Sequence, residues 1–189
     1  KPAAQLSGEE KKIRDLYDAF MDTAQIEKRG LAPAKKDLAK FAALKTPDDV
    51  ARAMGDPATP ADSLFGAFVN SDAKNPNQYV MIVTQSGLGM PNRDYYLKDD
   101  PALAQTREAY HKYLAAMLTL AGDKDAQKRA DAVYALENEI AKIHWTAVER
   151  RDADKTYNPM TEAQLASFAP GFAWATFFAA EGLSSKGPS

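Results

Sequence analysis

Helix-start signals recur along this 189-residue chain and constrain its fold more than any other feature. Ser7 stands three residues before Glu10, the pattern of a capping box in which each side chain bonds the other residue's backbone N–H. Thr46, Thr59 and Asp100 are each followed directly by proline, which is preorganised for the first turn of a helix. These signals predict a chain built mainly from short and medium α-helices.

Apolar residues at intervals of three and four follow most of these caps. The resulting stripes and stop signals predict helices over residues 8–29, 33–44, short stretches after 46 and 59, 101–121, 125–149, and two stretches after 161. The apolar stripe of residues 125–149 is narrow, as in antiparallel helices that pack side by side.

One segment has a different pattern. Residues 64–69 and 79–84 are rich in β-branched and aromatic side chains, and the stretch between them is dense in Asn, Asp and Pro. This pattern predicts a small antiparallel hairpin. The expected fold class is therefore mainly α, a multi-helix lobe with one small antiparallel β-hairpin.

Composition narrows the function classes. Apolar residues make up 45% and charged residues 26%, values typical of a folded soluble domain. The net charge is −2 with both signs interspersed, which argues against nucleic-acid binding or a polybasic membrane surface. No apolar run approaches the roughly 20 residues of a membrane span. The chain starts at Lys1 with neither an initiator Met nor a signal segment, so we expect a trimmed or excised product.

The search for catalytic residues finds no complete set. Cysteine is absent, and the two histidines, His111 and His144, do not form the H-E-x-x-H pattern of a zinc hydrolase. Glu108 and His111 form one Glu-x-x-His half of a di-iron site, but Ala141 stands where a second half would need its Glu. We therefore expect no metal bound by this chain. A surface acid beside a partly buried histidine is the simpler interpretation of Glu108 and His111.

An aromatic cluster lies close to the C-terminal end of the chain. It comprises Phe172, Trp174, Phe177 and Phe178, and the polar tail of residues 184–189 offers nothing to cover it. We expect these residues to contact a part of the protein that the chain lacks, and in this chain to leave either exposed apolar area or an oligomer contact.

Residues 87–97 read G-L-G-M-P-N-R-D-Y-Y-L, which resembles a specific element of the neprilysin and endothelin-converting-enzyme family. Further segments are similar to that family in the same order, so the resemblance covers nearly the whole chain: residues 13–31, L-E-N-E-I-A at 136–141, R-D at 151–152, Y-N-P-M-T at 157–161 and F-A-W at 172–174. The candidate motif residues are Gly87, Leu88, Gly89, Pro91, Arg93, Asp94, Tyr95 and Tyr96.

The resemblance implies a zinc-dependent metalloendopeptidase as the parent protein. Members of that family have two helical lobes around a large cavity, one carrying zinc and the other limiting entry to peptides. Residues 1–189 would be a partial N-terminal region, the helical substrate-gating lobe, without the catalytic zinc lobe. Zinc, peptide substrates and the missing lobe are thus expected for the parent, and no peptidase activity for this chain alone. The absence of Cys points to a bacterial, oligopeptidase O-like relative, periplasmic or secreted.

The resemblance carries over structural roles only. The glycines and Pro91 of the motif are expected to form a tight turn, and Arg93 and Asp94 to take part in a structural ion pair. A second hypothesis stays open: a free-standing helical binding or interaction module with the aromatic terminus as its contact surface.

Overall fold

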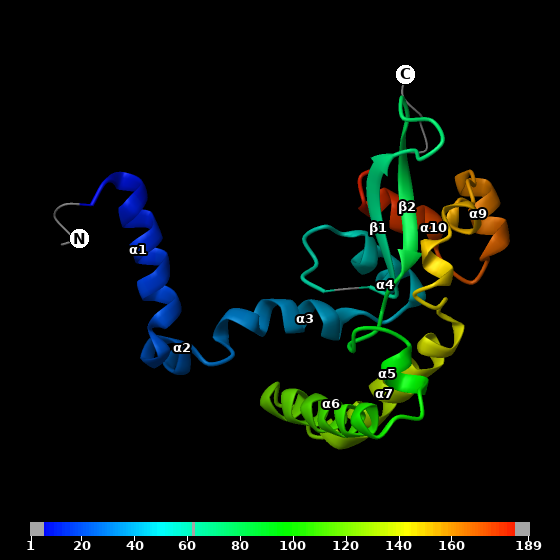
Figure 1. The fold of residues 1–189 in the computed structure, drawn as a ribbon. Helices are drawn as coiled ribbons and strands as arrows, with labels where there is room; N and C mark the ends of the chain where they lie inside the picture. The colour runs from blue at the N-terminus through cyan, green and yellow to red at the C-terminus, as the bar shows by residue number, and fades with distance from the viewer. Residues whose placement is uncertain (1–5, 62, 184–189) are drawn as a thin grey trace. The chain divides into compact units, whose positions relative to one another are not determined.

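A computed structural model describes residues 6–61 and 63–183, and the chain divides into two compact units, Lys1–Leu44 and Lys45–Ser189. The described residues are mainly helical with one two-stranded antiparallel sheet, which confirms the expected fold class (Figure 1).

The first unit consists of α1 (Gly8–Met21), α2 (Thr23–Arg29), a 3₁₀ turn η2 (Ala32–Ala34) and α3 (Lys35–Ala43). The Ser7 capping box is present as predicted. The single helix expected over residues 8–29 is wrong, because the chain breaks at Asp22, whose carboxylate accepts the N–H of Gln25 and caps a new helix. Within the described residues, none of the side chains of these helices is buried.

The second unit begins with α4 (Pro47–Gly55), capped by a box between Thr46 and Asp49. The helix expected after Thr59 is not formed in its described part, residues 59–61. A turn replaces it, in which the N–H of Thr59 donates to the carbonyl of Asp56 before the chain enters the sheet.

The predicted hairpin is confirmed. Strand β1 (Phe65–Ser71) pairs antiparallel with β2 (Tyr79–Gln85), with Phe65 opposite Gln85 and Ser71 opposite Tyr79.

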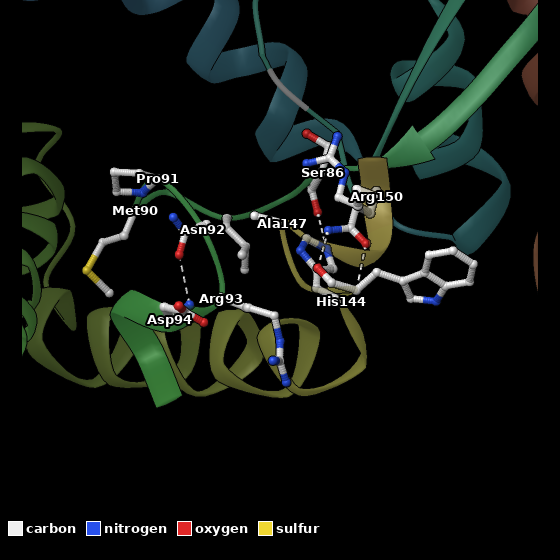
Figure 2. Close-up of a pocket in the computed structure, with 12 residues that line it drawn as sticks. Ser86, Met90, Pro91, Asn92, Arg93, Asp94, His144, Ala147 and Arg150 are labelled. Atoms are coloured by element: carbon white, nitrogen blue, oxygen red, sulfur yellow. Dashed lines mark hydrogen bonds between the residues drawn. The ribbon is translucent and has the colours of Figure 1, made fainter. Parts of the chain in front are cut away.

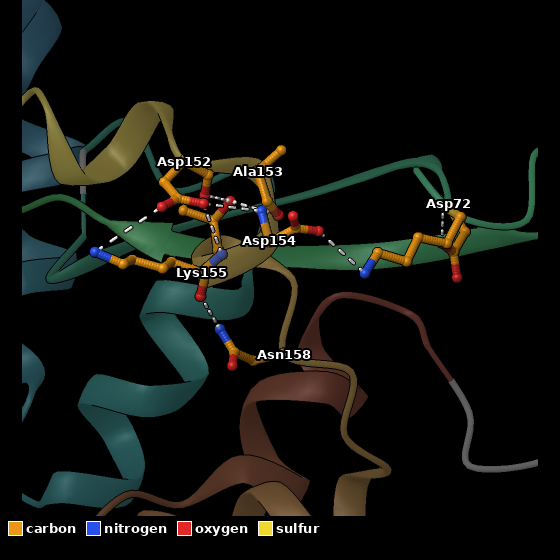
Figure 3. Close-up of polar contacts among 8 residues, drawn as sticks. Asp72, Asp152, Ala153, Asp154, Lys155 and Asn158 are labelled. Carbon is orange, nitrogen blue, oxygen red and sulfur yellow. Dashed lines mark hydrogen bonds and ion pairs between the residues drawn. The ribbon is translucent and has the colours of Figure 1, made fainter.

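The turn of this hairpin is tied to a later part of the chain. Asp72, only 8% exposed, accepts the N–H groups of Lys74 and Asn75, and the Tyr157 hydroxyl donates to it at 3.2 Å. These hydrogen bonds, the one from the Lys74 N–H foremost, lower the pKa of the Asp72 carboxyl. Lys74 also pairs with Asp154 of α8 (Ala153–Thr156) at 3.4 Å (Figure 3). The contacts fix the far end of the hairpin.

Two long helices pack side by side as predicted, α6 (Pro101–Leu120) and α7 (Ala126–Ile143), with α5 (Asp94–Leu97) against both. The buried Ala130 and Ala141 lie on α7. The helix expected to reach Glu149 ends earlier, because His144 takes an extended conformation (ψ 140°) and begins a bend toward η3 (Glu149–Arg151).

The main core lies where α10 (Trp174–Ala180) crosses α4 and β1, near α9 (Glu162–Phe168). Phe177 is 1% exposed and Trp174 is 6% exposed. The Phe65 ring lies 5.3 Å from that of Trp174 and 5.2 Å from that of Phe177. The expected exposure of these two aromatic residues is therefore wrong. Phe65 and α4 cover these two aromatic side chains. Both lie more than a hundred residues earlier in the chain, so the sequence around the aromatic residues gave no sign of this contact.

Candidate functional site

The G-L-G-M-P segment forms a crowded turn between β2 and α5. Gly87 has φ 85°, the left-handed region that favours glycine, and a Cβ there would lie 3.0 Å from the Leu64 Cα. Gly89 is required for a different reason. A Cβ on Gly89 would lie 1.9 Å from the hydroxyl oxygen of Tyr110, so only glycine lets the backbone pass this side chain.

A single carboxylate organises the side chains behind this turn. Glu137 of α7 accepts hydrogen bonds from the hydroxyls of Tyr96 at 2.8 Å and Tyr110 at 2.9 Å. The Tyr96 oxygen in turn accepts the backbone N–H of Met90 at 3.0 Å. The chain of bonds thus joins α7, α6 and α5 to the turn.

Burial and the neighbouring Glu137 carboxylate raise the pKa of Tyr96 to about 12, and the same causes raise that of Tyr110 further. Both hydroxyls consequently stay protonated and able to donate throughout the physiological pH range.

Arg93 and Asp94 have separate partners. The Arg93 Nε donates to the carbonyl of Ala141 at 3.3 Å, whereas Asp94 pairs with Lys98 at 3.7 Å. Arg107 donates to the carbonyls of Tyr95 and Lys98, both at 3.0 Å. The motif residues thus attach α5 to α6 and α7. Among the residues that the structure describes, Asp94 forms an ion pair of the expected kind and Arg93 does not.

The segment after α7 binds the end of β2. The side-chain amide of Gln85 donates to the carbonyl of Trp145 at 3.1 Å and accepts its N–H at 2.8 Å. The His144 Nε2 lies 3.0 Å from the Ser86 carbonyl, which can only accept, so Nε2 carries the hydrogen. Burial lowers the pKa of His144, and the nearby charges of Arg150 and Arg93 lower it further, against the opposing effect of the Ser86 hydrogen bond.

These contacts surround a cavity of about 220 Å³ on one side of the turn (Figure 2). Its lining residues come from the motif and from the segment after α7: Gln85, Ser86, Leu88, Met90, Pro91, Asn92, Arg93, Asp94, His144, Trp145, Ala147 and Arg150. We call this cavity the turn pocket. Sequence reasoning found its motif side but missed Gln85, Trp145 and Arg150, and it also missed Tyr110 and Glu137 behind the turn. The Leu-Glu pair at 136–137 was the one available signal for Glu137.

The candidate metal residues do not assemble. Glu108 pairs with Lys112 at 2.7 Å, and the His111 Nε2 pairs with Asp131 at 2.8 Å. In the described part of the chain, no group of three or more His, Cys, Asp and Glu side chains is placed to hold a metal ion. The described residues therefore do not fit a catalytic zinc site.

The other members of the aromatic cluster are partly buried. Phe172 and Phe178 pack beside Trp174, with ring centroids 4.7 and 5.9 Å away. Phe172 and Trp174 also line an open hollow between α4, α9 and α10. Contact of this cluster with further parts of the protein stays a prediction.

Comparison with known proteins places these features in a family. The sequence pattern of Peptidase family M13 matches residues 1–189, so the chain belongs to that family, as part of its N-terminal region. This confirms the resemblance to neprilysin-type zinc metallopeptidases.

Particular relatives agree with this assignment. Mouse endothelin-converting enzyme 1 is 34% identical over 119 residues, which is 60% of this chain and 15% of the relative. Rat endothelin-converting enzyme-like 1 is 31% identical over 116 residues, again 60% of this chain and 15% of the relative. The chain thus spans only a small part of these relatives.

Solved structures of Mycobacterium tuberculosis zinc metalloprotease 1 share the fold. The inhibitor complex matches with a TM-score of 0.80 and 35% identity, covering 89% of this chain and 26% of that one. The partial open state matches with a TM-score of 0.68 and 33% identity, covering 97% and 28%. No helix of the described residues is both long and apolar enough to cross a membrane.

Proposed function

We propose that this chain is a non-catalytic part of a neprilysin-like zinc endopeptidase, the helical lobe that walls the internal cavity and limits access by size. The observation that carries the proposal is coverage: the family pattern matches all 189 residues, yet the chain accounts for only 26% of the similar zinc metalloprotease 1 structure. The remaining three quarters of such a protein leave ample chain for a separate catalytic lobe.

The chemistry of the site supports this division. Peptide hydrolysis by a zinc enzyme needs a metal-bound water whose pKa is lowered to about 7. The described residues supply no ligand set for that metal. The parent would therefore hold zinc and cleave peptides through residues outside this chain, and the chain alone would be inactive.

The hydrogen bonds around the turn would make this part of the lobe rigid, as the wall of a size-limiting cavity needs to be. The Glu137 carboxylate and the Asp72 carboxylate each collect several hydrogen bonds from separate elements, which holds the loops between them in one geometry. Side chains locked in this way define an opening more sharply than mobile loops would. We place the parent in a bacterium, secreted or periplasmic, in keeping with the absence of Cys.

Assays on two proteins test the proposal. The purified chain and its full gene product are incubated with a flexible quenched peptide, with zinc and then with a chelator. We expect chelator-sensitive turnover by the full gene product only. A folded protein that displays the same cleavable sequence should resist cleavage by the full gene product. Turnover by the purified chain, or equal cleavage of the folded protein, would overturn the proposal.

One observation favours the alternative of a helical interaction module. In α1 several large apolar side chains are strongly exposed, among them Ile13 at 70%, Leu16 at 73% and Phe20 at 76%. An interaction module would present such a face to another protein. Reading the gene past Ser189 separates the hypotheses, since the peptidase requires an H-E-x-x-H sequence downstream.

A further inference from the structure

The α6–α7 pair carries an uncharged apolar face. Large apolar residues recur at intervals of three, four and seven along the two helices, which places them on one side of each helix. They are Tyr113, Met117 and Leu120 on α6 and Val133, Leu136 and Ile143 on α7. We call this set the paired-helix face. All of its members are exposed, Leu120 to 65% and Ile143 to 79%.

Almost all charged residues of the two helices lie outside this face. At about 100° per residue, no charged residue of α6 falls within the arc that Tyr113, Met117 and Leu120 span. The titratable residues of α6 that lie elsewhere on the helix include Arg107, Glu108, His111 and Lys112. On α7 the charged residue in line with the face is Arg129, near the start of the helix, and it pairs with Asp123 at 3.1 Å. A surface almost free of charge over several turns of two helices has the composition of a protein–protein contact.

The apolar stripes of the two helices form one surface. The His111 Nε2 lies 2.8 Å from the Asp131 carboxylate, and the Tyr110 hydroxyl donates to Glu137 at 2.9 Å, so these contacts identify the sides of α6 and α7 that adjoin. On each helix the apolar stripe lies on the opposite side of this seam from the His111–Asp131 contact. Because α6 and α7 pack side by side, the two stripes are neighbours (Figure 1).

The described residues leave the paired-helix face open to solvent. The apolar side of a helix is stabilised when it is buried against another element. The chain covers 26% of the similar zinc metalloprotease 1 structure, so most of a full-length relative lies outside the 189 residues. Cover by the same polypeptide costs none of the translational and rotational freedom that two separate molecules lose on association. The length of the remaining polypeptide therefore favours cover from within the full-length protein over cover by a second copy.

We propose that a helix from another part of the full-length polypeptide lies along the paired-helix face and forms a three-helix layer with α6 and α7. The stripe from Val133 to Ile143 is about 15 Å long at about 1.5 Å per residue, so a helix of about three turns covers it. The contacting side of that helix is apolar, since a charge buried against this face would find no partner there. The docking goes beyond the proposed wall function and does not depend on it.

Thiol labelling tests the docking. The chain contains no cysteine, so one introduced thiol reports how accessible a single position is. L136C places the thiol on the face, and A135C, at an exposed position beside it but outside the face, is the matched control. In the purified chain both thiols should react with a maleimide at similar rates. In the full gene product L136C should react at least about tenfold more slowly, whereas the rate of A135C should be unaltered.

Two labelling results would overturn the proposal. Equal rates for L136C in the purified chain and in the full gene product would show that the face stays open. Slow labelling of L136C in the purified chain itself would show that the 189 residues already cover the face. M117C extends the test to α6 and should follow L136C. Peptide mass spectrometry reads the label at each position, and thermal unfolding of each variant confirms that the fold is retained.

A photo-cross-link identifies what covers the face. In the full gene product p-benzoylphenylalanine replaces Leu136, and irradiation joins it to the neighbouring segment. We expect a product of monomer mass in which the joined peptide lies outside residues 1–189. A product of dimer mass would show that a second copy covers the face, and a product with a different protein would show an external partner. Either result would overturn the proposal. The labelling and the cross-link do not use peptidase activity, so their outcome is independent of the wall function.

Discussion

Glu137 of α7 joins two tyrosines that come from separate helices behind the turn. Its carboxylate accepts from Tyr96 and Tyr110, and Tyr96 in turn accepts the Met90 N–H. We predict that E137Q lowers the free energy of unfolding by about 1.5 kcal/mol, because the amide replaces a charged acceptor and puts an NH₂ group against two hydroxyl donors. Urea unfolding of E137Q beside E139Q, whose Glu139 pairs with Lys142 on the surface, measures this. The control should change by less than about 0.5 kcal/mol, and equal losses would contradict the role of Glu137.

The same network predicts a loss of stability in alkali. The pKa of Tyr96 is raised in the folded chain to about 12 by burial and by Glu137, above its ordinary value of 10.0. A raised pKa means that the stabilisation is complete below the unfolded value and is lost as pH rises through the folded one. Unfolding followed from pH 8 to pH 12 should therefore show stability falling from about pH 10 upward. In Y96F the fall should be shallower, and an unchanged profile would contradict this assignment.

At the scale of elements, the close approach of α4 and α10 depends on Gly55. A Cβ there would lie 2.4 Å from the Phe177 carbonyl oxygen and 3.1 Å from the Ala180 Cβ. We predict that G55A lowers the free energy of unfolding by about 1–3 kcal/mol, since the helices must separate around a crowded backbone contact. G171A is the matched control, because a Cβ at Gly171 meets no heavy atom within 4 Å. Thermal unfolding that ranks G55A equal to G171A would refute this account of the packing.

Elements were predictable from sequence where the determining contacts are local. The predicted helix caps at Ser7 and Thr46 each accept a backbone N–H only three residues away, and both form. The break at Asp22 was missed because a capping side chain lay inside an uninterrupted apolar pattern. The proline after Thr59 suggested a helix, but the described residues 59–61 follow a turn in which the Thr59 N–H donates to the Asp56 carbonyl.

The turn pocket could be predicted only in part, because only some of its contacts join residues that are close in sequence. Its motif side is a continuous stretch of sequence, and that stretch also identified the family. Gln85 and Trp145 are 60 residues apart, and Tyr110 and Glu137 are 27 apart, so their contacts exist only after the helices have packed. One sequence without an alignment carries no signal for such pairs.

For the molecule as a whole, the two units differ in how well they bury their side chains. The second unit holds the fully buried residues Ala51, Ala130 and Ala141 and the nearly buried Phe177. The helices of the first unit bury none of their described residues, and the longest of them, α1, has 14 residues. Isolated helices shorter than about 12–15 residues are marginal in water, so tertiary contacts normally decide their stability.

We therefore predict that backbone amides of α1–α3 in the purified chain exchange with deuterium on the order of 100-fold faster than those of α7 and α10, because local opening costs little free energy where few apolar contacts must break. Mass spectrometry of peptic fragments after timed exchange measures both sets in one sample, so α7 and α10 serve as the internal reference. Repeating the exchange at tenfold dilution removes any protection that self-association through the exposed face of α1 would give. Equal protection of α1 and α7 at both concentrations would show that packing within the 189 residues covers this face, and would contradict the exposure of Ile13, Leu16 and Phe20.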